Sequence, residues 1–89
     1  MPSISMFYGL VVYLYYIDNK QHNMPHIHVK YQRDEAVFNI LDGELLEGEL
    51  PKAKIRLIQA WIEVHREDLL TNWELALNGQ TPLPIEPLR

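Results

Sequence analysis

The spacing of apolar residues along the chain changes once, near Pro51. Before this residue, apolar positions fall in short runs that suit β-strands. After it they recur every three or four residues, which is typical of an amphipathic helix. The spacing predicts helix over residues 52–78, with Asn78-Gly79 as the stop signal. Because strands precede helix along the chain, we predict an α+β fold.

The first half predicts a small antiparallel sheet of three to five strands within residues 3–47. Its main strands are expected over residues 10–17, 26–31 and 36–41, with shorter pieces on either side. The first of these lacks polar alternation, which indicates a strand covered on both faces or one with an aromatic outer face. The turn signal Asp42-Gly43 comes just before the last short strand.

The helical stripe is long enough for two arrangements. It forms either one long helix or two packed helices that bend near His65-Arg66. Three ring-bearing residues of this segment, Trp61, His65 and Trp73, are the candidates for contact with a partner protein. The tail after Gly79 contains three prolines and is predicted to be extended, either docked or exposed.

Length and composition narrow the classes of protein. A chain of 89 residues forms a single domain, residues 1–89, with a small core. The absence of cysteine excludes disulfides, thiolate zinc sites and a cysteine nucleophile. No apolar run approaches the roughly 18 residues of a membrane span, and the N-terminal residues do not resemble a signal peptide. We therefore expect a cytoplasmic protein.

The net charge of −4 is unevenly distributed. Residues 1–33 are mildly basic, whereas residues 34–50 carry six acidic side chains and no basic one. An acidic total disfavours nucleic-acid binding through bulk charge. The basic block of residues 1–33 is nevertheless compatible with a local site for an anionic partner.

The residues best suited to chemistry are histidines near the first predicted loop. Alternation along HIHVKY places His26, His28 and Lys30 on one face of a strand. With His22 from the loop, His26 and His28 could bind a divalent transition metal such as zinc. Alternatively, His26 and His28 could act as acid and base in RNA cleavage, with Lys30 stabilising phosphate charge. A purely structural role for these side chains is a third interpretation.

Several segments together resemble a known family. They are the start ISMFYG, the stretch HNMPHIH, the segment LDGELLEGELP and the helical WIEVHREDLLTNWELALNG. Over nearly its whole length the chain is similar to the small prokaryotic domain-of-unknown-function family 4160. Members often have a second proline where this chain has Met24. The resemblance implies one half of a two-gene bacterial module of toxin–antitoxin type, and hence a protein partner.

These observations lead to a ranked pair of functions. The first is a non-enzymatic interaction protein of such a module, which binds a partner or associates with itself. The alternative is a small enzyme, a ribonuclease or metal-dependent hydrolase, that uses His22, His26 and His28. The sequence leaves the choice between enzyme and binding module open.

Overall fold

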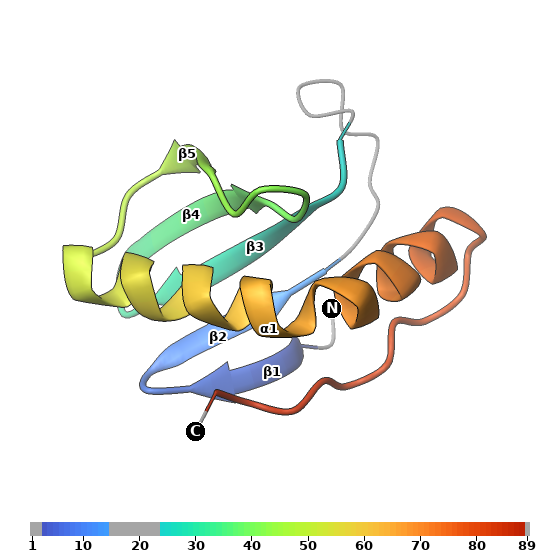
Figure 1. Cartoon of the computed structure of the whole chain (residues 1–89). Helices are drawn as coiled ribbons and strands as arrows, with labels where there is room; N and C mark the ends of the chain where they lie inside the picture. Colours follow the sequence, from blue (N-terminus) through green and yellow to red (C-terminus); the bar gives the residue numbers. More distant parts are fainter. Residues whose placement is uncertain (1–2, 15–23, 89) are drawn as a thin grey trace.

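A computed structural model describes residues 3–14 and 24–88 of the chain (Figure 1). It shows an α+β fold, as predicted: a five-stranded antiparallel sheet with one long helix packed across one face. The sheet is a simple meander in which every strand pairs with the next along the chain. The elements are β1 (Ser3–Phe7), β2 (Leu10–Tyr13), β3 (His26–Tyr31), β4 (Asp34–Asn39), β5 (Leu45–Gly48) and α1 (Lys52–Leu77).

The β1–β2 hairpin closes through a two-residue turn, Tyr8-Gly9. Both residues have positive φ angles, 50° and 83°, as a turn that matches the twist of paired strands requires. Lys54 of the helix fixes this turn from outside. Its Nζ donates a hydrogen bond to the Tyr8 carbonyl at 2.9 Å and lies 5.0 Å from the Tyr31 ring centre. The helix start is thereby attached to the hairpin.

The core lies between the sheet and α1. Alternate strand residues point toward the helix and are buried, including Val12, Ile27 and Phe38. The predicted apolar stripe of the helix meets them through Ile58, Trp61, Ile62, Leu69 and Trp73. Each fully buried aliphatic side chain of this kind contributes roughly 1.5–3 kcal/mol of transfer free energy.

The helix is continuous over residues 52–77 but is kinked at His65. This residue has φ −111° and ψ 23°, outside the helical range. The structure therefore combines the two predicted arrangements, a single long element that bends where the sequence indicated. The helix ends as predicted, because Gly79 takes a φ of 77° and the amide of Gln80 donates to the Leu75 carbonyl at 2.8 Å.

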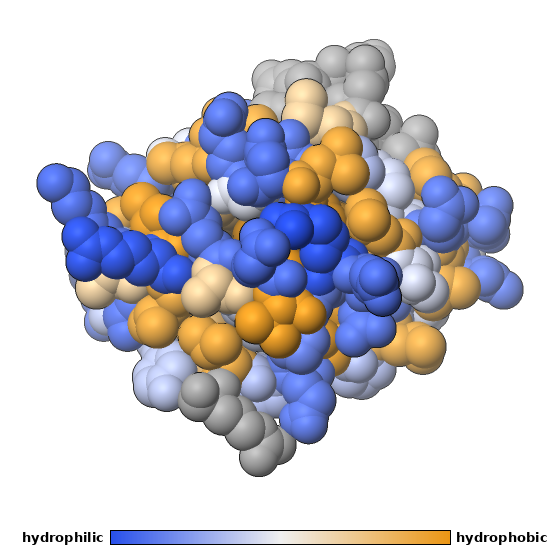
Figure 2. Space-filling view, viewed as in Figure 1, coloured by the Kyte–Doolittle hydropathy of each residue, from blue (hydrophilic) through white to orange (hydrophobic). Residues whose placement is uncertain are grey.

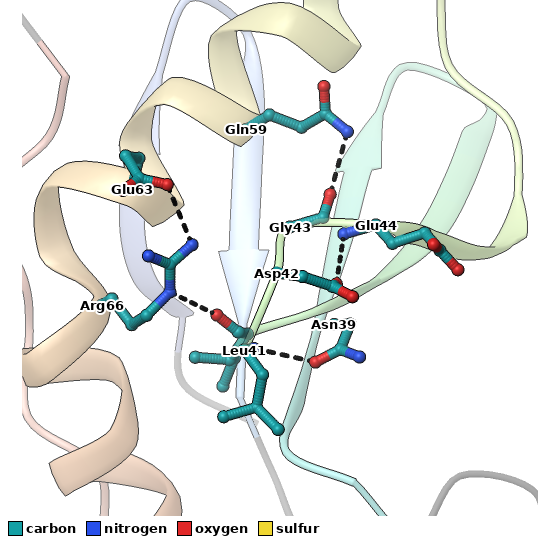
Figure 3. Close-up of polar contacts among 9 residues, drawn as sticks. Asn39, Leu41, Asp42, Gly43, Glu44, Gln59, Glu63 and Arg66 are labelled. Atoms are coloured by element: carbon teal, nitrogen blue, oxygen red, sulfur yellow. Dashed lines mark hydrogen bonds and ion pairs between the residues drawn. The ribbon is translucent and has the colours of Figure 1, made fainter.

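Polar contacts attach the β4–β5 connection to the helix (Figure 3). The Nε of Arg66 donates to the Ile40 carbonyl at 2.9 Å, and the Nε2 of Gln59 donates to the Gly43 carbonyl at 2.9 Å. The connection is itself ordered by Asn39, whose Oδ1 accepts from the Leu41 amide. Loop and helix therefore form one packed unit on this side.

The tail after α1 turns back along the helix toward β1 (Figure 1). Asn72 holds Leu83 by two hydrogen bonds, and the Nε1 of Trp61 donates to the Glu86 carbonyl at 2.8 Å. The amide of Ile85 donates to the Ile4 carbonyl at 2.8 Å, so the tail lies against the edge of β1. Of the two predicted states of this segment, the structure shows the docked one.

The strand boundaries differ in detail from those predicted. Strand β2 ends at Tyr13, and residues 15–17 of the predicted strand lie outside the described residues. Its outward side chains, Val11 and Tyr13, are half-exposed, which agrees with an aromatic outer face. Strand β4 begins at Asp34 rather than Ala36, because its cross-strand pairing continues to Tyr31. No helix within the described ranges is long and apolar enough to cross a membrane.

Candidate functional site: the outer face of the sheet

One face of the sheet is covered by α1, and the opposite face, here called the outer face, carries the predicted site. Strand register places Tyr13, His28, Val37 and Glu47 in one row across β2 to β5. The next row contains Val11, Lys30 and Glu35. Directly paired residues of neighbouring strands share a face, so these side chains lie side by side.

Solvent reaches much of the outer face. Lys30, Glu35 and Glu47 are exposed, and His28 is half-buried. Toward β1 the surface is apolar, with Met6 63% exposed. Toward β5 it becomes acidic, and a shallow groove of about 320 Å³ opens there. Its lining residues are His28, Glu35, Ala36, Val37, Glu47 and Gly48.

The side of the molecule that carries α1 has a different surface (Figure 2). Hydrophilic residues cover the helix, and hydrophobic residues lie in separate groups between them. One of these groups contains Val64, 68% exposed, which lines an open groove between the helix and the tail with His65, Pro87 and Leu88.

His26 shares a strand with His28 but has a different environment. Its side chain is fully buried, and its Nδ1 lies 2.8 Å from the Met24 carbonyl. A carbonyl only accepts hydrogen bonds, so Nδ1 carries the proton of this contact. The imidazole centre lies 5.0 Å from the Trp73 ring and 5.2 Å from the His28 ring. His26 is therefore part of the packed interior, and His28 is its half-exposed neighbour.

The structure thus brings together only part of the predicted catalytic trio, His26, His28 and Lys30. His28 and Lys30 lie on the outer face, two residues apart on β3; Lys30 is exposed, whereas the Nε2 atom of His28 is buried. His26 directs its hydrogen bond to backbone within the fold. Their participation in catalysis stays a prediction.

The predicted metal site of His22, His26 and His28 also stays a prediction. His22 lies outside the described residues. Within residues 3–14 and 24–88, no group of three or more His, Asp or Glu side chains is placed to hold a metal ion. His26 and His28 alone provide two imidazoles.

Of the predicted partner-binding residues of the helix, Trp61 and Trp73 face inward, whereas His65 lines an open groove beside the tail. Trp61 has no exposed surface, and its ring lies 5.3 Å from that of Phe7. Trp73 is 6% exposed. His65 is half-buried beside Trp61, with ring centres 5.6 Å apart. The helical stripe that holds these rings is already covered by the sheet and the tail, so a partner would have to displace the fold's own segments to reach the tryptophans.

A family model described as a domain of unknown function (DUF4160) matches residues 9–74. The chain belongs to this family. The match runs from the β1–β2 turn to the last turn of the helix, and so includes every outer-face residue named above except Met6. No curated protein and no solved structure matches the chain.

Two segments of this DUF4160 protein lie beyond the matched residues, and they contact each other. They are β1, before residue 9, and the tail, after residue 74. The hydrogen bond from Ile85 to Ile4 joins them. The signal for the tail contact was present in the sequence: Asn72 lies three residues after Leu69 on the apolar stripe, and a buried amide there needs partners.

Proposed function

We propose that this DUF4160 protein is a cytoplasmic, non-enzymatic interaction protein that binds a partner protein through the outer face of its sheet. In this proposal it is one component of a two-gene module of toxin–antitoxin type. The observation that supports binding is a difference in solvent exposure between the two faces of the sheet. The helix covers one face, whereas Met6, Val11 and Tyr13 of the other remain in reach of solvent.

The outer face has the composition of a protein interface. Its apolar side chains, Met6, Val11 and Tyr13, occupy the β1–β2 half, and the charged Lys30 and Glu35 border them. Protein interfaces commonly combine an apolar centre, rich in Tyr and Met, with a polar rim. A small domain also gains stability when a partner covers such a surface.

A charge placed within the apolar half tests this proposal. Val11→Glu should weaken binding of the product of the adjacent gene at least tenfold, measured by isothermal titration calorimetry, without changing the circular dichroism spectrum. The matched control is Val64→Glu, because Val64 is an exposed valine on the helix side. Equal binding by both variants, or no binding by the wild type, would contradict the proposal.

The alternative function, a small ribonuclease or metal-dependent hydrolase, is favoured by one observation. His28 lines the groove of the outer face with Glu35 and Glu47, and Lys30 lies two residues further along the same strand. For an enzyme, expression should arrest growth, and His28→Ala should abolish the arrest while Val11→Glu does not. His28 is the better test position because His26 is buried in the core.

A further inference from the structure

The two edge strands of the sheet are protected differently. The edge of β1 is covered by the tail, through the hydrogen bond from the Ile85 amide to the Ile4 carbonyl. Strand β5 forms the other edge, and within the described part of the chain only β4 pairs with it. In Figure 1, β5 lies on the side of the sheet away from the tail. An uncovered edge presents backbone donors and acceptors to a further strand.

The backbone direction along β5 follows from one hydrogen bond. The Glu49 amide donates to the Glu35 carbonyl of β4 at 3.3 Å, so the Glu49 amide points inward, toward β4. Successive residues of a strand direct their backbone groups to opposite sides. The Gly48 amide and carbonyl therefore point outward. Gly48 is exposed, and the side chain it lacks would lie on the β4 side, against the Glu35 carbonyl, so the outward backbone groups are left accessible.

The charges beside this edge determine which kind of strand can pair with β5. Exposed carboxylates flank it on Asp42, Glu44, Glu47 and Glu49. Residues 34–51 contain no lysine or arginine. Like charges on directly paired strands repel, so the β5 edge of a second copy is disfavoured as an occupant. A strand that carries lysine or arginine is favoured by the same charges.

The groove of the outer face extends this acidic edge inward. Its lining includes the carboxylates of Glu35 and Glu47 and the buried side chain of Val37. A lysine or arginine side chain has an aliphatic stem and a charged head. The aliphatic stem would pack against Val37, and the charged head would pair with the carboxylates of Glu35 and Glu47.

We infer that the partner contributes an extended basic segment, which adds to β5 as a sixth strand and places one lysine or arginine side chain in this groove. The inference rests on the proposed function, because it names the part of a partner protein that the sheet receives. Backbone hydrogen bonds provide affinity in this mode of recognition, and side-chain pockets provide specificity.

The test uses a defined probe, an acetylated seven-residue peptide that alternates lysine and valine. It should shift the amide resonances of residues 45–49 and slow hydrogen exchange of the Gly48 amide. The same peptide with glutamate for lysine should bind at least tenfold more weakly. An analogue with N-methylated alternate residues should also lose binding, because it cannot pair with the edge. Equal binding of all three peptides, or shifts outside β5 and its groove, would overturn the inference.

Protein variants complete the test. The pair Glu35→Lys and Glu47→Lys, combined in one chain, should reduce binding of the lysine peptide at least tenfold. Val64→Glu should leave it unchanged, because Val64 is exposed on the helix side of the molecule, away from β5 and its groove. If the peptide fails to bind while Val11→Glu still weakens binding of the adjacent gene product, the edge inference is wrong and the proposed function stands. If the peptide binds and Val11→Glu has no effect on that product, the proposed outer-face function is wrong.

Discussion

The side-chain amide of Asn72 pairs with the backbone of Leu83 through both of its polar atoms. Its Oδ1 accepts from the Leu83 amide at 2.9 Å, and its Nδ2 donates to the Leu83 carbonyl at 2.8 Å. Asn72 is 3% exposed, although Leu83 itself is 61% exposed. The buried side-chain amide of Asn72 thus makes the two backbone hydrogen bonds that a neighbouring strand would otherwise make with Leu83.

Asn72→Ala should therefore release the tail and destabilise the fold. It removes two hydrogen bonds of about 1 kcal/mol each, so we expect a loss of roughly 2 kcal/mol in the free energy of unfolding, measured with urea. Hydrogen exchange of the Leu83 and Ile85 amides should accelerate. Thr71→Ala is the control, because it truncates the exposed neighbouring side chain of the same helical turn and leaves both Asn72 hydrogen bonds in place. Unchanged exchange at Ile85 in Asn72→Ala would contradict a fastening role.

Trp61→Phe should weaken the same attachment at another point. The change removes the hydrogen bond from Nε1 to the Glu86 carbonyl and leaves a small cavity at a fully buried site. We expect a loss of about 2 kcal/mol by chemical denaturation. The double variant with Asn72→Ala should cost less than the sum of the single variants, because both act on one tail. Strict additivity would show that the two contacts are independent.

Gly48→Ala should be among the most damaging small substitutions. Gly48 has a φ of 81°, and a Cβ there would overlap the Glu35 carbonyl and lie 2.9 Å from the Cα of Ala36. Both obstacles are backbone atoms, which cannot turn away. We expect a loss of at least about 3 kcal/mol, combining the left-handed backbone conformation with overpacking.

The control for this effect is Gly79→Ala. Gly79 has a similar φ of 77°, but nothing lies within 4 Å of a Cβ placed there. Its cost should be about 1 kcal/mol, the conformational part alone. Similar melting temperatures for the two variants would show that the contact with β4 relaxes.

The Glu63 carboxylate should add to the free energy of unfolding near neutral pH but not in acid. The hydrogen bond and charge of Arg66, 3.0 Å away, hold the pKa of the Glu63 carboxyl below its ordinary value of 4.5. A carboxyl with a lowered pKa in the folded state stabilises that state above its ordinary value, and this contribution disappears as pH falls through the folded-state pKa. Wild type and Glu63→Gln should thus differ in urea midpoint near pH 7. This difference should disappear as the pH falls below 4.5.

Added salt provides an independent check of the Glu63 prediction. Glu63 is largely exposed, so about 1 M salt should screen the pair and reduce the difference near pH 7. A difference that persists equally in acid and in high salt would assign the effect to packing rather than charge.

Local patterns predicted most of the secondary structure. Alternation in HIHVKY predicted which side chains of β3 share a face. The helix predicted from the apolar stripe and the Asn78-Gly79 stop was confirmed to within one residue. These features depend on side-chain periodicity and turn chemistry, which act over a few residues. A bend near His65-Arg66 was one of the two arrangements that the sequence left open, and the structure has a kink at His65 within one continuous helix.

The depth of each side chain was much less predictable. His26 and His28 share a face by alternation, yet one is fully buried and the other only half-buried. Trp61 and Trp73 fitted a partner surface as well as a core. Periodicity gives the direction of a side chain relative to its own strand or helix but does not say which distant segment lies there.

The sequence by itself thus determined the α+β class, the faces of β3, the single helical stripe and the acidic character of residues 34–50. Only the tertiary structure decided that the tail covers β1, that β5 pairs with β4 alone among the described residues, and that carboxylates of β4 and β5 meet His28 at one groove. The physical reason is that these relationships join residues far apart along the chain. They follow from strand register and from competition among apolar segments for one small core, and neither is encoded in a local pattern.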